Sequence, residues 1–160
     1  MSAEALITSM EKLLKLHKSL YELAVKKTDI IKNGDMDALN QMLKDEQAHI
    51  AAIDRMETER QKAAQIITTG MDSPTVSDCM TVLSQAERLK LEAITNEMTG
   101  LVFELKEQNY LNQQLVHHSL QFVNVSMNLL RPQQESMNYG PPAKKKPSEK
   151  NTPGIFNSKV

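Results

Sequence analysis

Glu46 and His49 are the pair whose types and spacing come nearest to a metal site. The Glu-x-x-His spacing places a carboxylate and an imidazole on one face of a helix, where both can reach one ion, as in di-iron bundle proteins. Such a site needs a second Glu-x-x-His pair and two further glutamates. The chain has no second pair. We therefore expect Glu46 and His49 to lie on a solvated helix face, with no metal bound.

The other residues that could bind a metal or act as a nucleophile do not form a site together in the sequence. His117 and His118 are adjacent, so on a helix they point about 100° apart and cannot chelate one ion together. Cys79 is the single cysteine, which excludes an internal disulfide and fits a reducing cytosol, and no histidine near it in sequence can activate its thiol. No phosphate-binding glycine loop, zinc spacing or nucleophile elbow occurs. The sequence therefore predicts no catalytic residue and no cofactor; a metal-dependent helical enzyme is the alternative that metal analysis would test.

The composition is typical of long helices packed along narrow seams. Aromatic residues make up 4% of the 160 residues, Trp is absent, and ten Met contribute to the apolar content, so a thick globular core is not expected. Residues 1–130 hold 13 basic and 18 acidic side chains, whereas residues 131–160 hold six and two. An acidic body of this kind does not favour binding of nucleic acid. We expect a cytoplasmic protein, because no secretory signal and no run of 18 apolar residues is present.

Helical periodicity and turn signals divide the chain into four helices. Asn33-Gly34-Asp35 separates the first two, Ser73-Pro74 is expected to begin a short one, and Ser84 with Glu87 forms a capping box for the last. The expected helices are residues 3–32, 36–68, 74–83 and 85–130. The predicted fold is all-α, an elongated antiparallel three-long-helix coiled-coil bundle with a short connecting helix. This bundle covers residues 1–131, and the Pro- and Lys-rich tail, 132–160, is expected to be disordered.

The last helix is predicted to be longer than the hairpin on which it packs. At 46 residues it would span about 69 Å, against about 45–50 Å for the hairpin. Residues 108–130 contain no Lys, Arg, Asp or Glu, although a window of 23 residues should hold about five or six charges at the 24% found in the chain. The end of this helix is therefore predicted to present an uncharged surface to a partner.

The apolar face of this helix shifts along its length. A bundle seam of Leu and Ile continues as far as Leu105 and is followed by Gln108 and Asn112. A second row with heptad spacing then begins on a neighbouring face. We call it the C-terminal stripe: Val116, Leu120, Val123, Met127 and Leu130. The stripe is expected to bind a partner helix, unless it packs on the short helix or on a second copy of the chain. Asn109 and Asn112 either bind the partner's backbone or set helix register inside the bundle.

Two motifs stand out beside the Leu-rich first helix, the acidic second helix and the Pro/Gly-rich tail. They are Asn33-Gly34-Asp35-Met36-Asp37-Ala38-Leu39 and Asn109-Tyr110-Leu111-Asn112-Gln113-Gln114-Leu115, the second followed by Ser119-Leu120. Through these features the chain resembles the FlgN-like flagellar export chaperones over about residues 6–130.

The resemblance implies a cytoplasmic, non-enzymatic chaperone of the flagellar type III secretion system. Members of the family bind the C-terminal segments of hook–filament junction proteins through their C-terminal helix, keep these clients soluble and deliver them to the membrane export gate. The client-binding residues would then be Asn109, Asn112 and the C-terminal stripe. A tail tyrosine contributes to gate docking in some members, and Tyr139 is the counterpart in this chain. A homodimer through the exposed helix end, as in a structural coiled coil, and a regulator that sequesters another helical protein are the alternatives.

Overall fold

The computed structural model describes residues 2–131, and these form four helices. They are α1 (Ser2–Asn33), α2 (Met36–Ile67), α3 (Val76–Met80) and α4 (Gln85–Leu130). The predicted fold class is confirmed: the described residues are helical, with three long helices and a short connecting one. Each long helix begins and ends within one residue of the position expected from the sequence. Residues 132–160, with the predicted tail and Tyr139, lie outside the described residues.

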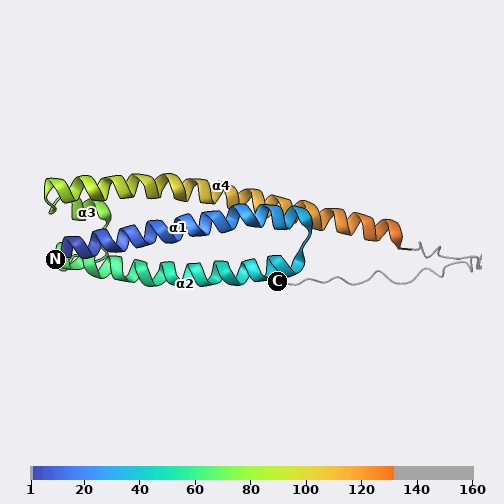
Figure 1. The fold of residues 1–160 in the computed structure, drawn as a ribbon, viewed down its shortest axis with the longest axis horizontal. Coiled ribbons are helices and arrows are strands. Elements are labelled where there is room, and N and C mark those ends of the chain that lie inside the picture. Colours follow the sequence, from blue (N-terminus) through green and yellow to red (C-terminus); the bar gives the residue numbers. More distant parts are fainter. Residues whose placement is uncertain (1, 132–160) are drawn as a thin grey trace, which may run out of the picture.

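The three long helices lie side by side, and α1 is the one that contacts both of the others. α1 and α2 form an antiparallel hairpin, and α4 runs back in the direction of α1 (Figure 1). α1 packs along both α2 and α4, whereas α2 and α4 do not form a comparable packed pair within residues 2–131. Because α4 has 46 residues and α1 has 32, α4 continues past the α1–α2 turn (Figure 1).

The α1–α2 turn follows from two residues. Gly34 has a φ of 68°, a left-handed conformation that glycine adopts without steric cost, and its N–H donates to the Ile31 carbonyl over 3.2 Å. Asp35 then caps α2, because its carboxylate accepts the Ala38 N–H at 3.0 Å. These contacts make the turn short and force α1 and α2 to be antiparallel.

The expected start of the short helix was wrong. Ser73 has a positive φ of 51° and Pro74 is buried ahead of the helix, so neither residue begins it. Thr75 is the N-cap: its hydroxyl accepts the Asp78 N–H at 3.2 Å, and the Asp78 carboxylate accepts the Thr75 N–H at 2.8 Å. This second capping box starts α3 at Val76, and the helix ends at Met80 rather than at residue 83.

The capping box predicted for the long third helix is present at the start of α4. The Glu87 carboxylate accepts the Ser84 hydroxyl at 2.8 Å and the Ser84 N–H at 3.1 Å. The hydroxyl bond and then the backbone bond favour the ionised carboxylate and lower the pKa of Glu87 below its ordinary value of 4.5. The stabilisation that Glu87 gives is therefore complete above about pH 4.5 and is lost as the pH falls through the lowered pKa.

Acid should remove the difference between the protein and a Glu87→Gln variant. We expect the variant to unfold at a lower urea concentration near pH 6, and the two midpoints to converge as the pH falls through the lowered pKa of Glu87 and its carboxylate becomes protonated. Glu92→Gln, at an exposed site on the same helix, is the control. A midpoint difference that stays constant over this range would contradict the assignment.

The core is concentrated at the end of the bundle that contains α3. Leu6, Leu91 and Cys79 are completely buried there and come from α1, α4 and α3, respectively. They form one cluster with buried side chains of all four helices and of the loop that leads into α4. The other members of the cluster are Ile7, Met10, Leu13, Leu14, Ala63, Ala64, Ile67, Leu83 and Ile94. Tertiary stability is therefore greatest far from the projecting end of α4.

Candidate functional site

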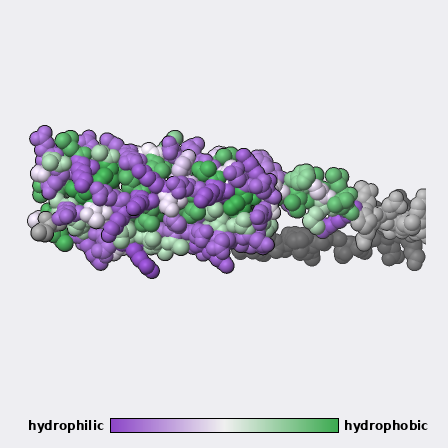
Figure 2. Space-filling model, viewed as in Figure 1, coloured by the Kyte–Doolittle hydropathy of each residue, from purple (hydrophilic) through white to green (hydrophobic). Residues whose placement is uncertain are grey.

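The projecting end of α4 is apolar and open to solvent. From Val116 to Leu130 every residue is exposed except Ser126, which is half-buried. In Figure 2 this end is a mainly hydrophobic segment that protrudes from a bundle on which hydrophilic and hydrophobic side chains are interspersed. A helix end on which no other part of residues 2–131 packs gains little from its apolar side chains, so this surface is the candidate functional site.

The C-terminal stripe lies on this projecting end. The exposed fraction of its residues is 37% at Val116, between 49% and 58% at the next three, and 81% at Leu130. The alternative that the stripe packs on the short helix is wrong, because α3 lies against the core at the other end of the bundle. Within residues 2–131, nothing in the chain covers the stripe.

A second apolar face of the same end was only partly foreseen. Val125 is nine residues from Val116, half a turn around the helix, and it is exposed together with Phe122 and Leu129. Phe122 continues the heptad of the bundle seam, which is the signal that could have identified this face. The projecting end is thus apolar on two sides, which are separated by Ser, Asn, Gln and His.

Asn112 belongs to the bundle interior, which corrects its assignment to the client-binding residues. Only 3% of its surface is exposed. Its side-chain amide donates to the Ala24 carbonyl over 2.8 Å, and its oxygen accepts the Thr28 hydroxyl. The Gln108 amide donates to the same hydroxyl. These bonds fix the register of α4 on α1, and they engage both the amide nitrogen and the oxygen of Asn112.

Asn109 is exposed and lies in a groove that the C-terminal stripe enters. This open groove, with a volume of about 460 Å³, separates α4 from α2 near the α1–α2 turn. Its eight lining residues come from all three long helices. They are Leu20 and Lys27 of α1, Glu46 and Ile50 of α2, and Asn109, Asn112, Gln113 and Val116 of α4. Lys27 and Glu46 neutralise each other there, with Nζ 3.0 Å from Oε2.

The side chains considered above as metal-binding or catalytic candidates do not come together in one site. Glu46 pairs with Lys27, while His49 Nε2 lies 2.8 Å from the Ser19 hydroxyl, so this carboxylate and this imidazole serve different contacts. Within the described part of the chain, no three His, Cys, Asp or Glu side chains are grouped closely enough to hold a metal ion. Cys79 is buried, and burial raises the pKa of its thiol, which keeps the sulfur protonated.

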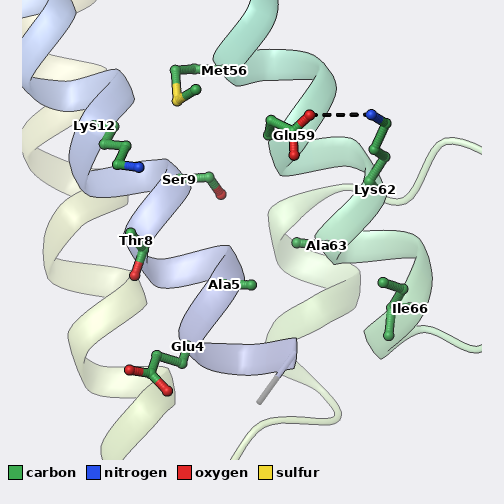
Figure 3. Close-up of a pocket in the computed structure, with 10 residues that line it drawn as sticks. All are labelled: Glu4, Ala5, Thr8, Ser9, Lys12, Met56, Glu59, Lys62, Ala63 and Ile66. Atoms are coloured by element: carbon green, nitrogen blue, oxygen red, sulfur yellow. Dashed lines mark hydrogen bonds and ion pairs between the residues drawn. The ribbon is translucent and has the colours of Figure 1, made fainter.

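A hollow of about 610 Å³ lies between α1 and α2 near the N-terminus. Figure 3 shows that Glu59 and Lys62 of α2 bond to each other at its rim, while Glu4 and Lys12 extend from α1. No nucleophile with an adjacent base is among the ten residues that line it. The hollow is a shallow surface between two helices, and it supplies no arrangement for catalysis. No helix among residues 2–131 combines the length and apolar character needed to span a bilayer.

Comparison with known proteins identifies the family. The family model described as FlgN protein matches residues 1–147. The chain is 31% identical to a Bacillus subtilis (strain 168) protein described as uncharacterized protein YvyG, over 160 residues that cover the whole of both chains. No solved structure matches the chain. With a match across almost its whole length, the chain belongs to the FlgN family of flagellar export chaperones.

Proposed function

We propose that this protein is a cytoplasmic chaperone that binds the C-terminal segments of hook–filament junction proteins. It keeps these clients soluble and export-competent and delivers them to the export gate, and it carries out no catalysis itself. The observation that supports client binding most strongly is the projecting end of α4, where the C-terminal stripe is exposed and charge is absent from residues 108–130. A client helix would lie along the stripe with its apolar face inward.

The composition of the projecting end suits this role. Covering a charged side chain without a partner is costly, and a surface without Lys, Arg, Asp or Glu avoids that cost. Burial of the five stripe side chains would contribute roughly 5–10 kcal/mol before the entropy of association is subtracted. The net affinity is then moderate, which suits a chaperone that must release its client.

Delivery is proposed to use the tail, with Tyr139 as the contact to the export gate. Tyr139 lies outside the described residues, so support comes from the family resemblance and from its position nine residues after Leu130. A tail contact would leave the projecting end free to hold the client while the chaperone is docked.

Calorimetric titration tests the proposal directly. The purified full chain is titrated with C-terminal segments of the hook–filament junction proteins encoded in the same genome. We expect saturable binding with one segment per chain and a negative heat-capacity change, since apolar surface is buried. No heat of binding with any of these segments would refute the proposed function.

Self-association is the second candidate, and the same exposed stripe favours it. Two copies could bury their projecting ends against each other as a homodimer. Sedimentation equilibrium separates the candidates: a dimer that persists when diluted and does not bind client would favour self-association over chaperone activity.

A further inference from the structure

The open groove faces a part of the bundle where a fourth helix is missing. α2 and α4 both pack on α1, and near the α1–α2 turn the groove separates them. A bundle of three helices that leaves such a groove offers another helix a floor on α1 and walls on α2 and α4. Leu20 lies at the α1 side of the groove, Ile50 on α2 and Val116 on α4.

At the other end of the bundle, the chain fills the equivalent place itself. Leu6 and Leu13 of α1 are buried there in a cluster that includes Cys79 of α3. Seven-residue spacing keeps Leu6, Leu13 and Leu20 on one face of α1. On α2, Ile50 is likewise two heptads from Ala64, which is completely buried in the same cluster. The face that α3 helps to cover at one end therefore continues into the open groove, where Leu20 is half-buried and Ile50 is exposed.

The α2 wall of the groove extends as a row of exposed apolar residues. Met36, Leu43 and Ile50 are seven residues apart, so they lie on one face of α2, and all three are exposed. Asn40 and Gln47 lie between them on that face. Asn109, Gln113 and Val116 on the α4 side are likewise apolar or amide-bearing. The two charged residues that line the groove, Glu46 of α2 and Lys27 of α1, pair with each other.

We propose that the open groove receives an amphipathic helix of the client, which lies on the C-terminal stripe and continues between α2 and α4. The client helix would complete a four-helix bundle with α1, α2 and α4, in the place that α3 occupies at the other end. This inference rests on the proposed function and adds α2 to the client-binding surface. The spacing of Gln113, Val116, Leu120 and Val123 is three, four and three, so the groove and the stripe are one continuous face of α4.

The occupant is a helix of a partner rather than the tail of the same chain. The α2 row from Met36 to Ile50 spans 14 residues, about 21 Å, so a helix that covers it needs about four turns. Residues 132–160 contain Pro or Gly at seven positions, and their longest stretch without either is residues 133–139. Seven residues form about two turns, and Pro interrupts a longer helix.

A matched pair of substitutions on α2 tests the inference. Ile50→Asp should weaken binding of the client segment about tenfold in the same titration, because a charge would enter a dry helix interface. Ile66→Asp is the control: it makes the same change on the same helix at a more exposed site, 68% against 50%, outside the groove. We expect its affinity to stay within about twofold of that of the unmodified protein.

A spectroscopic readout covers the case in which Ile50→Asp unfolds the protein. An environment-sensitive dye on Ile50→Cys should shift to the blue when the client segment is added, while the same dye on Ile66→Cys should not. Cys79 is buried and does not compete for the label.

The outcomes separate this inference from the proposed function. If Leu120→Asp with Val123→Asp prevents binding while Ile50→Asp leaves it unchanged and the dye does not shift, the client uses α4 alone and the inference is wrong. If Ile50→Asp alters the sedimenting mass but not client affinity, the groove belongs to a second copy and the inference is likewise wrong. If the unmodified protein binds no client, the proposed function fails and the inference fails with it.

Discussion

Replacement of Leu120 and Val123 by Asp is expected to abolish client binding while the bundle stays folded. Both side chains belong to the C-terminal stripe, and 58% and 49% of their surfaces are exposed, so the free protein loses little packing. In the complex, two carboxylates would enter an interface without charges to pair with them. We expect a loss of about 3 kcal/mol or more, a weakening of ~100-fold or more, measured by calorimetric titration.

A control with the same chemistry is available on the same helix. Leu89 and Val102 lie before the uncharged window and are 60% and 43% exposed, close to the values at Leu120 and Val123. Leu89→Asp with Val102→Asp therefore adds the same two charges to α4 outside the projecting end. We expect unchanged affinity for this control and circular dichroism of both variants close to that of the unmodified protein. Equal loss of binding in the two variants would show that charge alone, rather than the stripe, accounts for the effect.

Replacement of Leu91 by Ala is expected to cause the largest loss of stability. Leu91 is completely buried where α1, α3 and α4 meet, and its removal leaves a cavity beside Leu6 and Cys79 in one cluster. Substitutions of this kind cost about 2–5 kcal/mol, a large part of the total stability of a small domain. We expect Tm to fall by about 10 °C, measured by calorimetry or circular dichroism.

Leu129→Ala is the matched control for Leu91→Ala. It makes the same change on the same helix, at a side chain that is 81% exposed. We expect Tm to change by about 1 °C or less, since no cavity forms. If the two variants have the same Tm, the projecting end contributes to stability as much as the core does. The distinction between a stabilising core and an unpacked helix end is then wrong.

Local chemistry made most of the fold predictable from the sequence. Gly34 and Asp35 allow one tight turn, and Ser84 with Glu87 satisfies the first N–H groups of α4, so these boundaries depend on neighbours in sequence. The start of α3 was misplaced because two helix-start signals overlap there. Ser73-Pro74 and Thr75-Asp78 are both reasonable N-termini. Because the path of the loop gives Ser73 a positive φ, the helix begins after Thr75.

The candidate site was less predictable, because periodicity gives the face of a residue but not how far a neighbouring helix reaches. Asn109 and Asn112 are both amides in an uncharged segment, yet Asn112 is buried beside Thr28 and Asn109 is exposed. The two residues lie three positions apart, and the angle at which α1 crosses α4 determines which of them is buried. The α2 row was also missed, because Leu43 and Ile50 read as ordinary members of a hairpin seam until α4 is seen to lie away from α2.

Hydrogen exchange measured by mass spectrometry tests the central claim most directly. That claim is that residues 116–130 form an uncovered helix end in the free chain and become covered when client binds. An unpacked helix end opens at low cost, so its amides should exchange at least ~10-fold faster than those of the buried seam at residues 91–105. Addition of a hook–filament junction protein's C-terminal segment should slow exchange in residues 116–130 and leave residues 91–105 unchanged. If residues 116–130 of the dilute, client-free monomer are already as protected as residues 91–105, the end is covered by its own chain and the account is wrong.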